Sequence, residues 1–313
     1  MEVAISFFQA LAHSAIGFFL SFVEFVTARP KSVVDRVIVI TGAAQGIGKE
    51  VAAKFAALKA KVVLLDINSE MNAKAAEEIR QSGGCAYDFV VDVTRPEEMR
   101  QIAKTIKDHK DLGCADIVIC SAGILIPKLL EDNTDADIRR TFDVNVLGYF
   151  WVGDIFFQSS PMLTYYSDDK GFYPMMLSRG SGHLVAISSV GGHFGCSYSS
   201  SYSASKFAAR GLMESLEWEI YDHGMCNRIK TTTVYPCFTD TNLLQFCNVH
   251  SPILRLLTVE ETAQGVVDAI LYEKCEAYIP FYARWFCLEL KSIASMSKYV
   301  RQAFRNFFDI RYR

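Results

Sequence analysis

VIVITGAAQGIGKEVAAKFAAL, at residues 37–58, is the stretch that decides the fold. An apolar β-branched run at 37–40 breaks into a small-residue turn, and an Ala-rich segment with helical spacing follows, which predicts a strand, a tight turn and a helix. Gly42 suits unusual turn dihedrals, Gly46 admits a ligand close to the backbone, and Gly48 lets the helix lie close to the strand. A pyrophosphate is therefore expected at the helix N-terminus.

A second strand is expected at KVVLLD, residues 61–66, which ends in a carboxylate. In a parallel sheet this strand would bring Asp66 to the adenosine ribose hydroxyls of a bound dinucleotide. A carboxylate there repels a 2′-phosphate, so the sequence favours NAD(H) over NADP(H). The alternative is that Asp66 merely caps the helix that follows, and the glycine turn ahead of it makes this the weaker interpretation.

The composition of the chain is that of one α/β domain. Its 313 residues are half hydrophobic, which is ample for a single core of about 250 residues. The formal net charge of −3 and the lack of a strong basic block argue against nucleic acid as a partner. Nine cysteines form no CxxC pair and no Cys/His cluster with zinc spacing, so we expect reduced thiols facing the cytosol and no metal.

The N-terminal segment, residues 1–32, is a candidate for membrane association. VAISFFQALAHSAIGFFLSFV, at 3–23, has no formal charge and is long enough to cross a bilayer as a helix. Glu2 precedes the apolar run and Arg29 and Lys31 follow it, which disfavours a cleaved signal peptide and predicts a cytosolic body.

A narrow polar stripe at helical spacing interrupts this apolar run, formed by Ser6, Gln9, His13, Gly17 and Glu24. Three geometries stay open. A spanning helix would pair through the stripe, a helix lying in the membrane surface would turn the stripe toward water, and a soluble helix would cover the domain or another subunit.

After the second strand, the spacing predicts a helix over 69–81 and a third strand over 86–93. Asp92 near the end of that strand either meets the adenine or is a solvated strand terminus, and the residues alone leave both open. Thr94 and Glu97 predict a capping box for the next helix.

Two more buried strands are expected, at 116–120 and at 183–188. The first leads into a turn of small residues at Ala122 and Gly123, which would let the backbone pass close to the cofactor. Ser189 follows the second strand, at the edge where open α/β sheets bind their ligands.

Asn145 lies in a long helical segment that starts at about Asp135, among Phe, Val and Leu residues. A buried amide must find hydrogen-bond partners or carry a desolvation cost. Asn145 is therefore either a satisfied core amide or a functional group, and the residues alone favour neither.

Tyr202 and Lys206 are four residues apart at the start of another predicted helix, so their side chains share one face. A free tyrosine has a pKa near 10 and is a poor proton carrier at neutral pH. A neighbouring cation stabilises the phenolate and brings the group into range. Placed after Ser189 on a nucleotide fold, the pair is a candidate catalytic site.

Together, these motifs resemble those of the short-chain dehydrogenase/reductase family over residues 37–280: TGAAQGIG, the Asp66 strand end, CSAG at 120–123, Asn145, Ser189 and YSASK at 202–206. The resemblance implies that Tyr202 is the general acid/base, that Ser189 polarises the reacting oxygen, and that Lys206 binds the nicotinamide ribose while lowering the tyrosine pKa. It also implies that Asn145 holds a water in a proton relay. The expected cofactor contacts are Gly42, Gln45, Gly46, Ile47, Gly48, Asp66, Asp92, Val93, Ala122, Gly123, Tyr202, Lys206 and Thr241.

Further segments resemble the membrane-associated branch that contains retinol dehydrogenases and 17-beta-hydroxysteroid dehydrogenases: the apolar N-terminus, RPKSV at 29–33, YSASKFAARG at 202–211 and the expected strand IKTTTVYP at 229–236. This branch implies a lipophilic substrate, namely a retinoid, a steroid or a fatty alcohol. It also implies a homodimer formed through the Asn145 and Tyr202 helices. The expected location is the endoplasmic reticulum membrane or a lipid droplet, with the catalytic domain facing the cytosol.

Three departures from the family pattern stand out. Cys120 and Ser121 replace the usual pair of asparagines, and Cys237 stands where glycine is common. QSSPMLTYYSDDKGFY, at 158–173, reads as an insertion and predicts a protruding loop. It is open whether this loop is a lid, a partner-binding loop or an unusual splice form.

The substrate end is expected beyond Pro236. Residues 238–257 are irregular and rich in Leu and Phe, as in a cover over an apolar pocket. Thr258 and Glu261 predict a capping box, and the last strand is expected near 277–280. The tail at 281–313 interleaves aromatics with cations, which suits either a membrane interface or a helix over the pocket.

The predicted fold is a single-domain doubly wound (Rossmann) parallel sheet at 33–280, with the apolar segment at 1–32 before it and the tail at 281–313 after it. The predicted activity is NAD(H)-dependent interconversion of a lipophilic alcohol and its ketone or aldehyde. The rival hypothesis is a scaffold at a membrane or lipid-droplet surface that binds nucleotide without turnover. The intact set of Asn145, Ser189, Tyr202 and Lys206 counts against that rival.

Overall fold

The computed structural model of the chain describes residues 28–157, 176, 179–245, 247–250, 255–285, 287–288 and 309–312. Two compact units divide the chain, Met1–Ser32 and Val33–Arg313, and the sheet lies in the second. The apolar segment at 3–23, the insertion at 158–173 and most of the tail at 281–313 lie outside the described residues. None of the helices within the described ranges is long and apolar enough to cross a bilayer.

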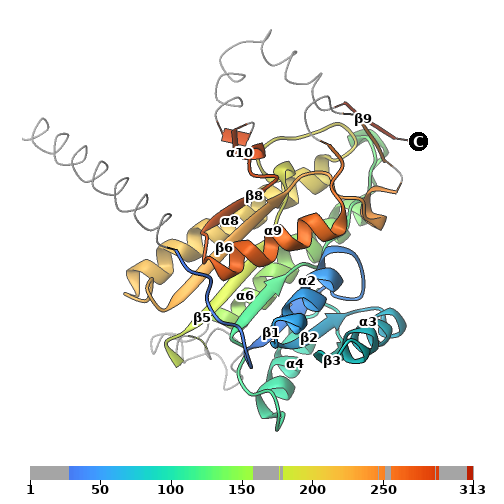
Figure 1. Ribbon diagram of the computed structural model, residues 1–313. Helices are drawn as coiled ribbons and strands as arrows, with labels where there is room; N and C mark the ends of the chain where they lie inside the picture. Colours follow the sequence, from blue (N-terminus) through green and yellow to red (C-terminus); the bar gives the residue numbers. More distant parts are fainter. Residues whose placement is uncertain are drawn as a thin grey trace, which may run out of the picture. The chain divides into compact units, whose positions relative to one another are not determined.

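Seven described strands form one parallel sheet in the order β3-β2-β1-β4-β5-β6-β8 (Figure 1). Their bounds are β1 Val37–Thr41, β2 Lys61–Asp66, β3 Cys85–Val90, β4 Ile117–Cys120, β5 Gly182–Ile187, β6 Ile229–Pro236 and β8 Glu276–Ile279. Because β1 pairs with both β2 and β4, the strand order reverses between β1 and β4 and opens a ligand crevice at their carboxyl ends. The predicted doubly wound sheet is confirmed.

Helices cover both faces of this sheet. Their bounds are α2 Gly46–Ala57, α3 Ser69–Gln81, α4 Pro96–Asp108, α5 Asp135–Phe142, α6 Gly148–Phe157, α8 Ser200–Asp222, α9 Val259–Leu271 and α10 Ala283–Trp285. Short 3-10 turns lie at Leu130–Asp132, Val190–Gly192 and Asn242–Leu244, and β7 (Cys247–His250) pairs antiparallel with β9 (Asp309–Tyr312).

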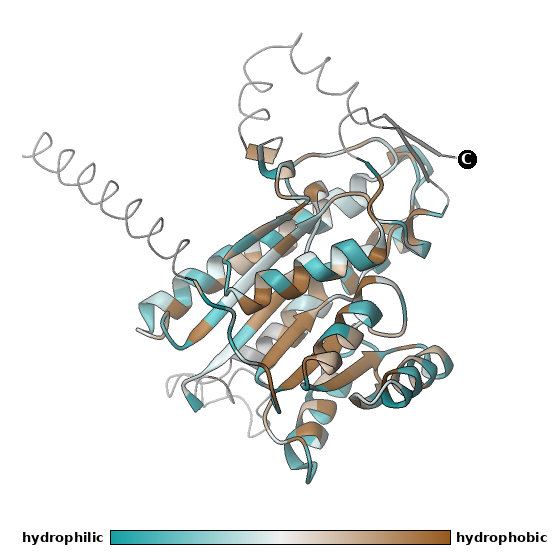
Figure 2. Cartoon of the chain, viewed as in Figure 1, coloured by the Kyte–Doolittle hydropathy of each residue, from teal (hydrophilic) through white to brown (hydrophobic). Residues whose placement is uncertain are grey.

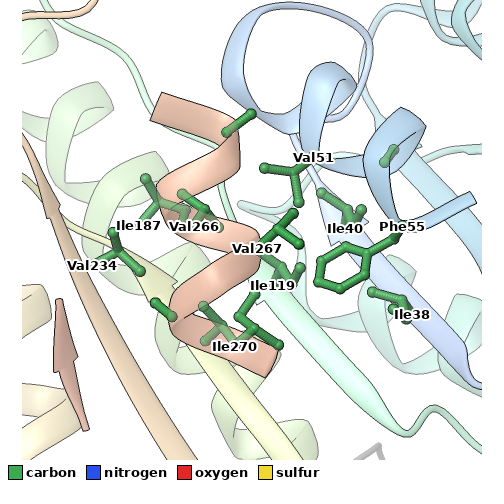
Figure 3. Close-up of a cluster of buried hydrophobic side chains, with 14 of the residues drawn as sticks. Ile38, Ile40, Val51, Phe55, Ile119, Ile187, Val234, Val266, Val267 and Ile270 are labelled. Carbon is green, nitrogen blue, oxygen red and sulfur yellow. The ribbon is translucent and has the colours of Figure 1, made fainter. Parts of the chain in front are cut away.

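The core follows from the alternation of side chains along the strands. In β1, Ile38 and Ile40 pack in the cluster that α2, α3 and α9 cover, whereas Val37 and Val39 pack in the cluster on α4, α6 and α8. Figure 3 shows the first cluster, in which Phe55 of α2 is fully buried. Hydrophobic residues concentrate on the strands (Figure 2), as burial of a parallel sheet on both faces requires.

Two expectations for the segment after β3 are wrong in detail. The strand ends at Val90 rather than at residue 93, so Asp92 lies in the loop that follows. The capping box of Thr94 and Glu97 is absent, because Arg95 is the N-cap of α4 without a side-chain bond. The hydroxyl and backbone N–H of Thr94 both donate to Asp92 Oδ1 instead, at 2.8 and 2.9 Å.

The long helix expected from about Asp135 is interrupted. α5 is followed by a π turn at Asp143–Leu147 and then by α6. Asn145 therefore lies in a widened turn between two α-helical segments, and such turns are frequent at functional sites.

Candidate active site

A cavity of about 560 Å³ lies at the carboxyl ends of the central strands. All thirteen predicted cofactor contacts line it, and so do three of the four predicted catalytic residues, Ser189, Tyr202 and Lys206. Asn145 is fully buried and does not line the cavity. The sequence motifs thus converge at the crevice where strand order reverses, and the chemical role of each residue stays a prediction.

Two glycines of the turn after β1, Gly42 and Gly48, leave no room for a side chain. Gly42 has φ +66°, and a Cβ on it would lie 2.7 Å from the Ala122 Cα. A Cβ on Gly48 would collide with the Gly42 carbonyl oxygen. The start of α2 therefore packs tightly on the turn, and its first residues line the cavity, where a helix N-terminus would favour a phosphate. These residues fit a bound dinucleotide.

Thr41 organises the second turn of the site, the one that follows β4. Its hydroxyl accepts hydrogen bonds from the backbone N–H groups of Ser121 at 3.1 Å and Ala122 at 3.3 Å. Cys120 beside them is buried, and burial raises the pKa of its thiol, so the thiol is protonated at neutral pH.

Asp66 ends β2 with its carboxylate held by two backbone donors. Ala44 N–H donates to one oxygen at 3.1 Å and Asn68 N–H to the other at 2.9 Å. The N-cap of α3 is Asn68, whose side chain accepts from Met71 N–H at 3.0 Å. The alternative in which Asp66 caps α3 is therefore wrong.

Ser189 and Tyr202 meet across the turn that follows β5. Ser189 Oγ accepts a hydrogen bond from Gly191 N–H at 3.0 Å, which fixes the serine at the start of its 3-10 turn. Burial raises the pKa of Tyr202, and a side-chain hydrogen bond with Ser189 opposes that rise. The phenol is therefore protonated at neutral pH and available as a proton donor.

Lys206 lies one turn of α8 beyond Tyr202 and is 4% exposed. Its Nζ donates to the Ile187 carbonyl at 2.9 Å and to the Tyr149 hydroxyl at 3.5 Å. Burial lowers the pKa of Lys206 to about 8, and the neighbouring Cys120 works in the opposite direction. At neutral pH the ammonium is still mostly charged.

Asn145 holds two separate parts of the chain together. Its Oδ1 accepts from Ile124 N–H at 2.8 Å, and its Nδ2 donates to the Ile124 carbonyl at 2.9 Å and to Ser205 Oγ at 3.0 Å. These bonds match the alternative of a satisfied core amide. The water relay implied by the family resemblance stays a prediction.

The segment after β6 closes the cavity from the other side. Asn242 Nδ2 donates to Gln45 Oε1 at 2.7 Å, which joins this segment to the glycine turn 197 residues away in the sequence. Cys237 is buried in the lining, and burial raises the pKa of its thiol. Thr241 also lines the cavity, and its hydroxyl donates to the Thr239 carbonyl at 3.4 Å.

Sequence reasoning missed two residues of the site, Thr41 and Tyr149. The only sequence signal for Tyr149 is its spacing of one helical turn from Asn145. Thr41 is visible in the sequence as the first residue of TGAAQGIG, but the motif does not indicate its hydrogen bonds to the turn after β4. Both act through hydrogen bonds to residues more than 35 positions away, which no local pattern encodes.

Comparisons with known proteins agree with this geometry. The family model described as short chain dehydrogenase matches residues 36–250. Human 17-beta-hydroxysteroid dehydrogenase 13 is 33% identical over 262 residues, covering 84% of this chain and 80% of that protein. Mouse epidermal retinol dehydrogenase 2 is 34% identical over 271 residues, covering 86% and 81%.

Solved structures share the fold at lower identity. A short chain dehydrogenase/reductase from Burkholderia phymatum in complex with NAD superposes with a TM-score of 0.71 and 21% identity, covering 85% of this chain and 96% of that one. A gluconate 5-dehydrogenase from Burkholderia cenocepacia in complex with NADP and tartrate gives a TM-score of 0.66 and 22% identity, covering 78% and 93%. The chain therefore belongs to the short-chain dehydrogenase family and is an oxidoreductase that acts on CH–OH groups with a nicotinamide cofactor.

Proposed function

We propose that this protein uses NAD(H) to interconvert a lipophilic alcohol and its ketone or aldehyde, with retinol and a 17-beta-hydroxysteroid as the leading substrates. One observation carries the proposal. Ser189, Tyr202 and Lys206 line the same cavity as the glycine turn and Asp66, so proton-transfer groups and a dinucleotide cradle share one space.

The chain's own residues would handle the proton and the substrate oxygen. The bound nicotinamide would accept the hydride in oxidation and supply it in reduction. In oxidation, Tyr202 as phenolate would take the hydroxyl proton, while Ser189 holds the reacting oxygen by a hydrogen bond. The Lys206 ammonium would stabilise the phenolate and bind the nicotinamide ribose.

The preference for NAD(H) rests on the charges at the adenosine end of the cavity. Asp66 and Asp92 line this end, and none of the described residues of β2, β3 or the loops after them contributes a lysine or arginine to the lining. A 2′-phosphate would therefore meet two carboxylates, whereas Arg95, whose Nε lies 3.8 Å from Asp92 Oδ2, does not line the cavity. The Asp66 carboxylate, fixed by two backbone N–H groups, suits the two hydroxyls of an unphosphorylated ribose.

A lipophilic substrate is supported by the apolar part of the lining and by the relatives. Apolar side chains from several segments line the cavity, among them Leu125, Pro127, Phe194, Phe238, Leu243 and Leu244. The similar proteins are named for hydroxysteroids, retinol and estradiol. An apolar wall discriminates chain shapes weakly, so fatty alcohols belong to the same candidate class.

The decisive experiment follows NADH formation by the full chain in detergent or lipid, with all-trans-retinol and with a 17-beta-hydroxysteroid, beside NADP⁺ controls. Turnover with NAD⁺ that disappears in Tyr202→Phe supports the proposal. Binding of NADH without Tyr202-dependent turnover of any lipid alcohol would instead support the non-catalytic scaffold. Tyr235→Phe, which removes a buried tyrosine hydroxyl elsewhere in the core, is the matched control.

We also propose that residues 1–32 associate with the endoplasmic reticulum membrane or a lipid droplet, with the catalytic domain in the cytosol. The uncharged run at 3–23 and the cations at Arg29 and Lys31 support this location. Removing residues 1–32 should release the protein from the membrane fraction, and retention would refute the proposal. A homodimer is proposed from the family resemblance, and light scattering of the purified chain tests it.

A further inference from the structure

Tyr149 of α6 contacts the Lys206 ammonium. The tyrosine is 3% exposed, and its hydroxyl donates a hydrogen bond to the Ile187 carbonyl at 2.8 Å. Lys206 Nζ donates to the same carbonyl at 2.9 Å and to the Tyr149 hydroxyl oxygen at 3.5 Å. The three groups are therefore mutually hydrogen-bonded: the Tyr149 hydroxyl contacts the ammonium and also the Ile187 carbonyl to which the ammonium donates.

The aromatic ring of Tyr149 also lies close to the cation. Lys206 Nζ lies 5.4 Å from the centroid of the Tyr149 ring and 5.7 Å from that of the Tyr202 ring. A ring attracts a cation electrostatically within about 6 Å of its centroid, and more strongly where water is excluded. The ammonium is therefore flanked by two rings and bonded to two oxygens.

No carboxylate of the described residues is among the groups that shift the pKa of Lys206. The titratable groups facing its ammonium are Cys120 from β4, Tyr149 from α6 and Tyr202 from α8 itself. Burial raises the pKa of each of these three groups, so all are neutral at neutral pH. Within the described part of the chain the buried positive charge has no carboxylate to stabilise it, so the loss of one contact weighs heavily.

Two residues on one face of the helical segment that carries Tyr149 form hydrogen bonds with successive residues of α8. Asn145 and Tyr149 are one helical turn apart. Asn145 Nδ2 donates to Ser205 Oγ at 3.0 Å, while the Tyr149 hydroxyl accepts from Lys206. The π turn that carries Asn145 packs on α8, and the contact of Tyr149 with Lys206 lies next to this packing.

We propose that Tyr149 is a positioning residue, whose hydroxyl and ring hold the Lys206 ammonium charged and in place beside Tyr202. Its consequence for turnover rests on the proposed function, whereas its effect on Lys206 does not. Tyr149→Phe removes the hydroxyl and keeps the ring, and Tyr149→Leu removes both. Tyr235→Phe is the matched control, because it also removes a buried hydroxyl, one that donates to Glu276 at 2.9 Å.

The first measurement is the pH dependence of Lys206 acylation by acetic anhydride in the full chain without cofactor, quantified by mass spectrometry. Only the neutral amine reacts, so the midpoint reports the ionisation of Lys206. Loss of one charge-assisted contact should lower the midpoint by about half a pH unit in Tyr149→Phe, a threefold change in the ionisation constant, and by about one unit in Tyr149→Leu. Tyr235→Phe should leave it unchanged.

The second measurement is the pH profile of kcat for alcohol oxidation. The pH above which kcat stops rising reports Lys206, so it should move to lower pH by the same amounts. On the acid side, where the ammonium stays protonated, the profiles of wild type and variants should coincide. A merely structural role would lower kcat equally at every pH.

An acylation midpoint that does not shift in Tyr149→Phe refutes the role of the hydroxyl. A midpoint that does not shift in Tyr149→Leu refutes the whole proposal, and so does a shift in Tyr235→Phe as large as that in Tyr149→Phe. Should the leucine variant not fold, the phenylalanine variant, which keeps the ring packing, decides alone. If the wild type oxidises no alcohol, the proposed function fails, while the acylation midpoint still decides the role of Tyr149.

Discussion

Replacing Asp66 by asparagine should move the cofactor preference from NADH toward NADPH. Two backbone N–H groups fix the carboxylate at the end of β2, at 3.1 and 2.9 Å. A 2′-phosphate with about two negative charges, held ~4 Å away, would be repelled by about 2 kcal/mol even at the dielectric constant of water. Asparagine removes this repulsion and weakens the ribose hydrogen bonds by about 1 kcal/mol. The ratio of the two dissociation constants should therefore change by about a hundredfold.

The assay is a fluorescence titration of NADH and NADPH into the wild type, Asp66→Asn and the control Glu70→Gln. Glu70 is an exposed carboxylate in the first turn of α3 and does not line the cavity, so its removal changes net charge equally but should leave the ratio intact. The change should shrink as salt rises, since ions screen the repulsion. Equal binding of NADH and NADPH by the wild type, or an unaltered ratio in Asp66→Asn, would refute the reasoning.

Three further outcomes are expected. Tyr202→Phe should lower kcat of alcohol oxidation by about 10²- to 10⁴-fold with NADH binding retained in fluorescence titrations, and near-normal turnover would remove Tyr202 from the mechanism. Because burial raises the pKa of Tyr202, oxidation should accelerate as pH rises until Lys206, with a pKa of about 8, loses its proton. Carbonyl reduction should be fastest on the acid side. Profiles of kcat against pH, measured for oxidation and for reduction, check both expectations. Gly42→Ala should lower the free energy of unfolding by more than the ~1–2 kcal/mol of left-handed strain, because the new Cβ would lie 2.7 Å from Ala122. Gly83 also has a positive φ, of +81°, but a Cβ on it would meet no atom within 4 Å, so Gly83→Ala measures the backbone strain alone. If both variants lost the same free energy of unfolding in thermal or denaturant melts, the close contact at Gly42 would be contradicted.

Segments with strong local signals were predictable from sequence. The helix at 69–81 and the strand at 229–236 have the predicted bounds, and the capping box of Thr258 and Glu261 is confirmed. The box at Thr94 failed, because the threonine hydroxyl donates to Asp92 instead of accepting from the start of α4. A sequence pattern indicates which groups a hydroxyl could bond, but which of them it does bond depends on the conformation of the folded loop.

In the site, too, features set by a short local motif were predictable, and features set by distant contacts were not. The glycine turn, Ser189 and the spacing of Tyr202 and Lys206 were visible, because each is a short motif at the end of a predicted element. The π turn around Asn145 was not, since residues 143–147 are as apolar and helical in pattern as those around them. Tyr149 was not visible either, because its contact with α8 depends on how two elements pack.

The departure at Cys120 and Ser121 shows how the turn after β4 is held without the family's asparagine pair. A turn between strand and cavity needs acceptors for its backbone N–H groups, because buried N–H groups without partners are costly. Thr41 in the neighbouring strand supplies one hydroxyl oxygen to two of them, Ser121 and Ala122, and β1 and β4 pair directly at this level. Cys120, just ahead of these two residues, carries a buried, protonated thiol. Because the acceptor for this turn comes from β1, the backbone N–H groups of Ser121 and Ala122 have a partner even without the two asparagines.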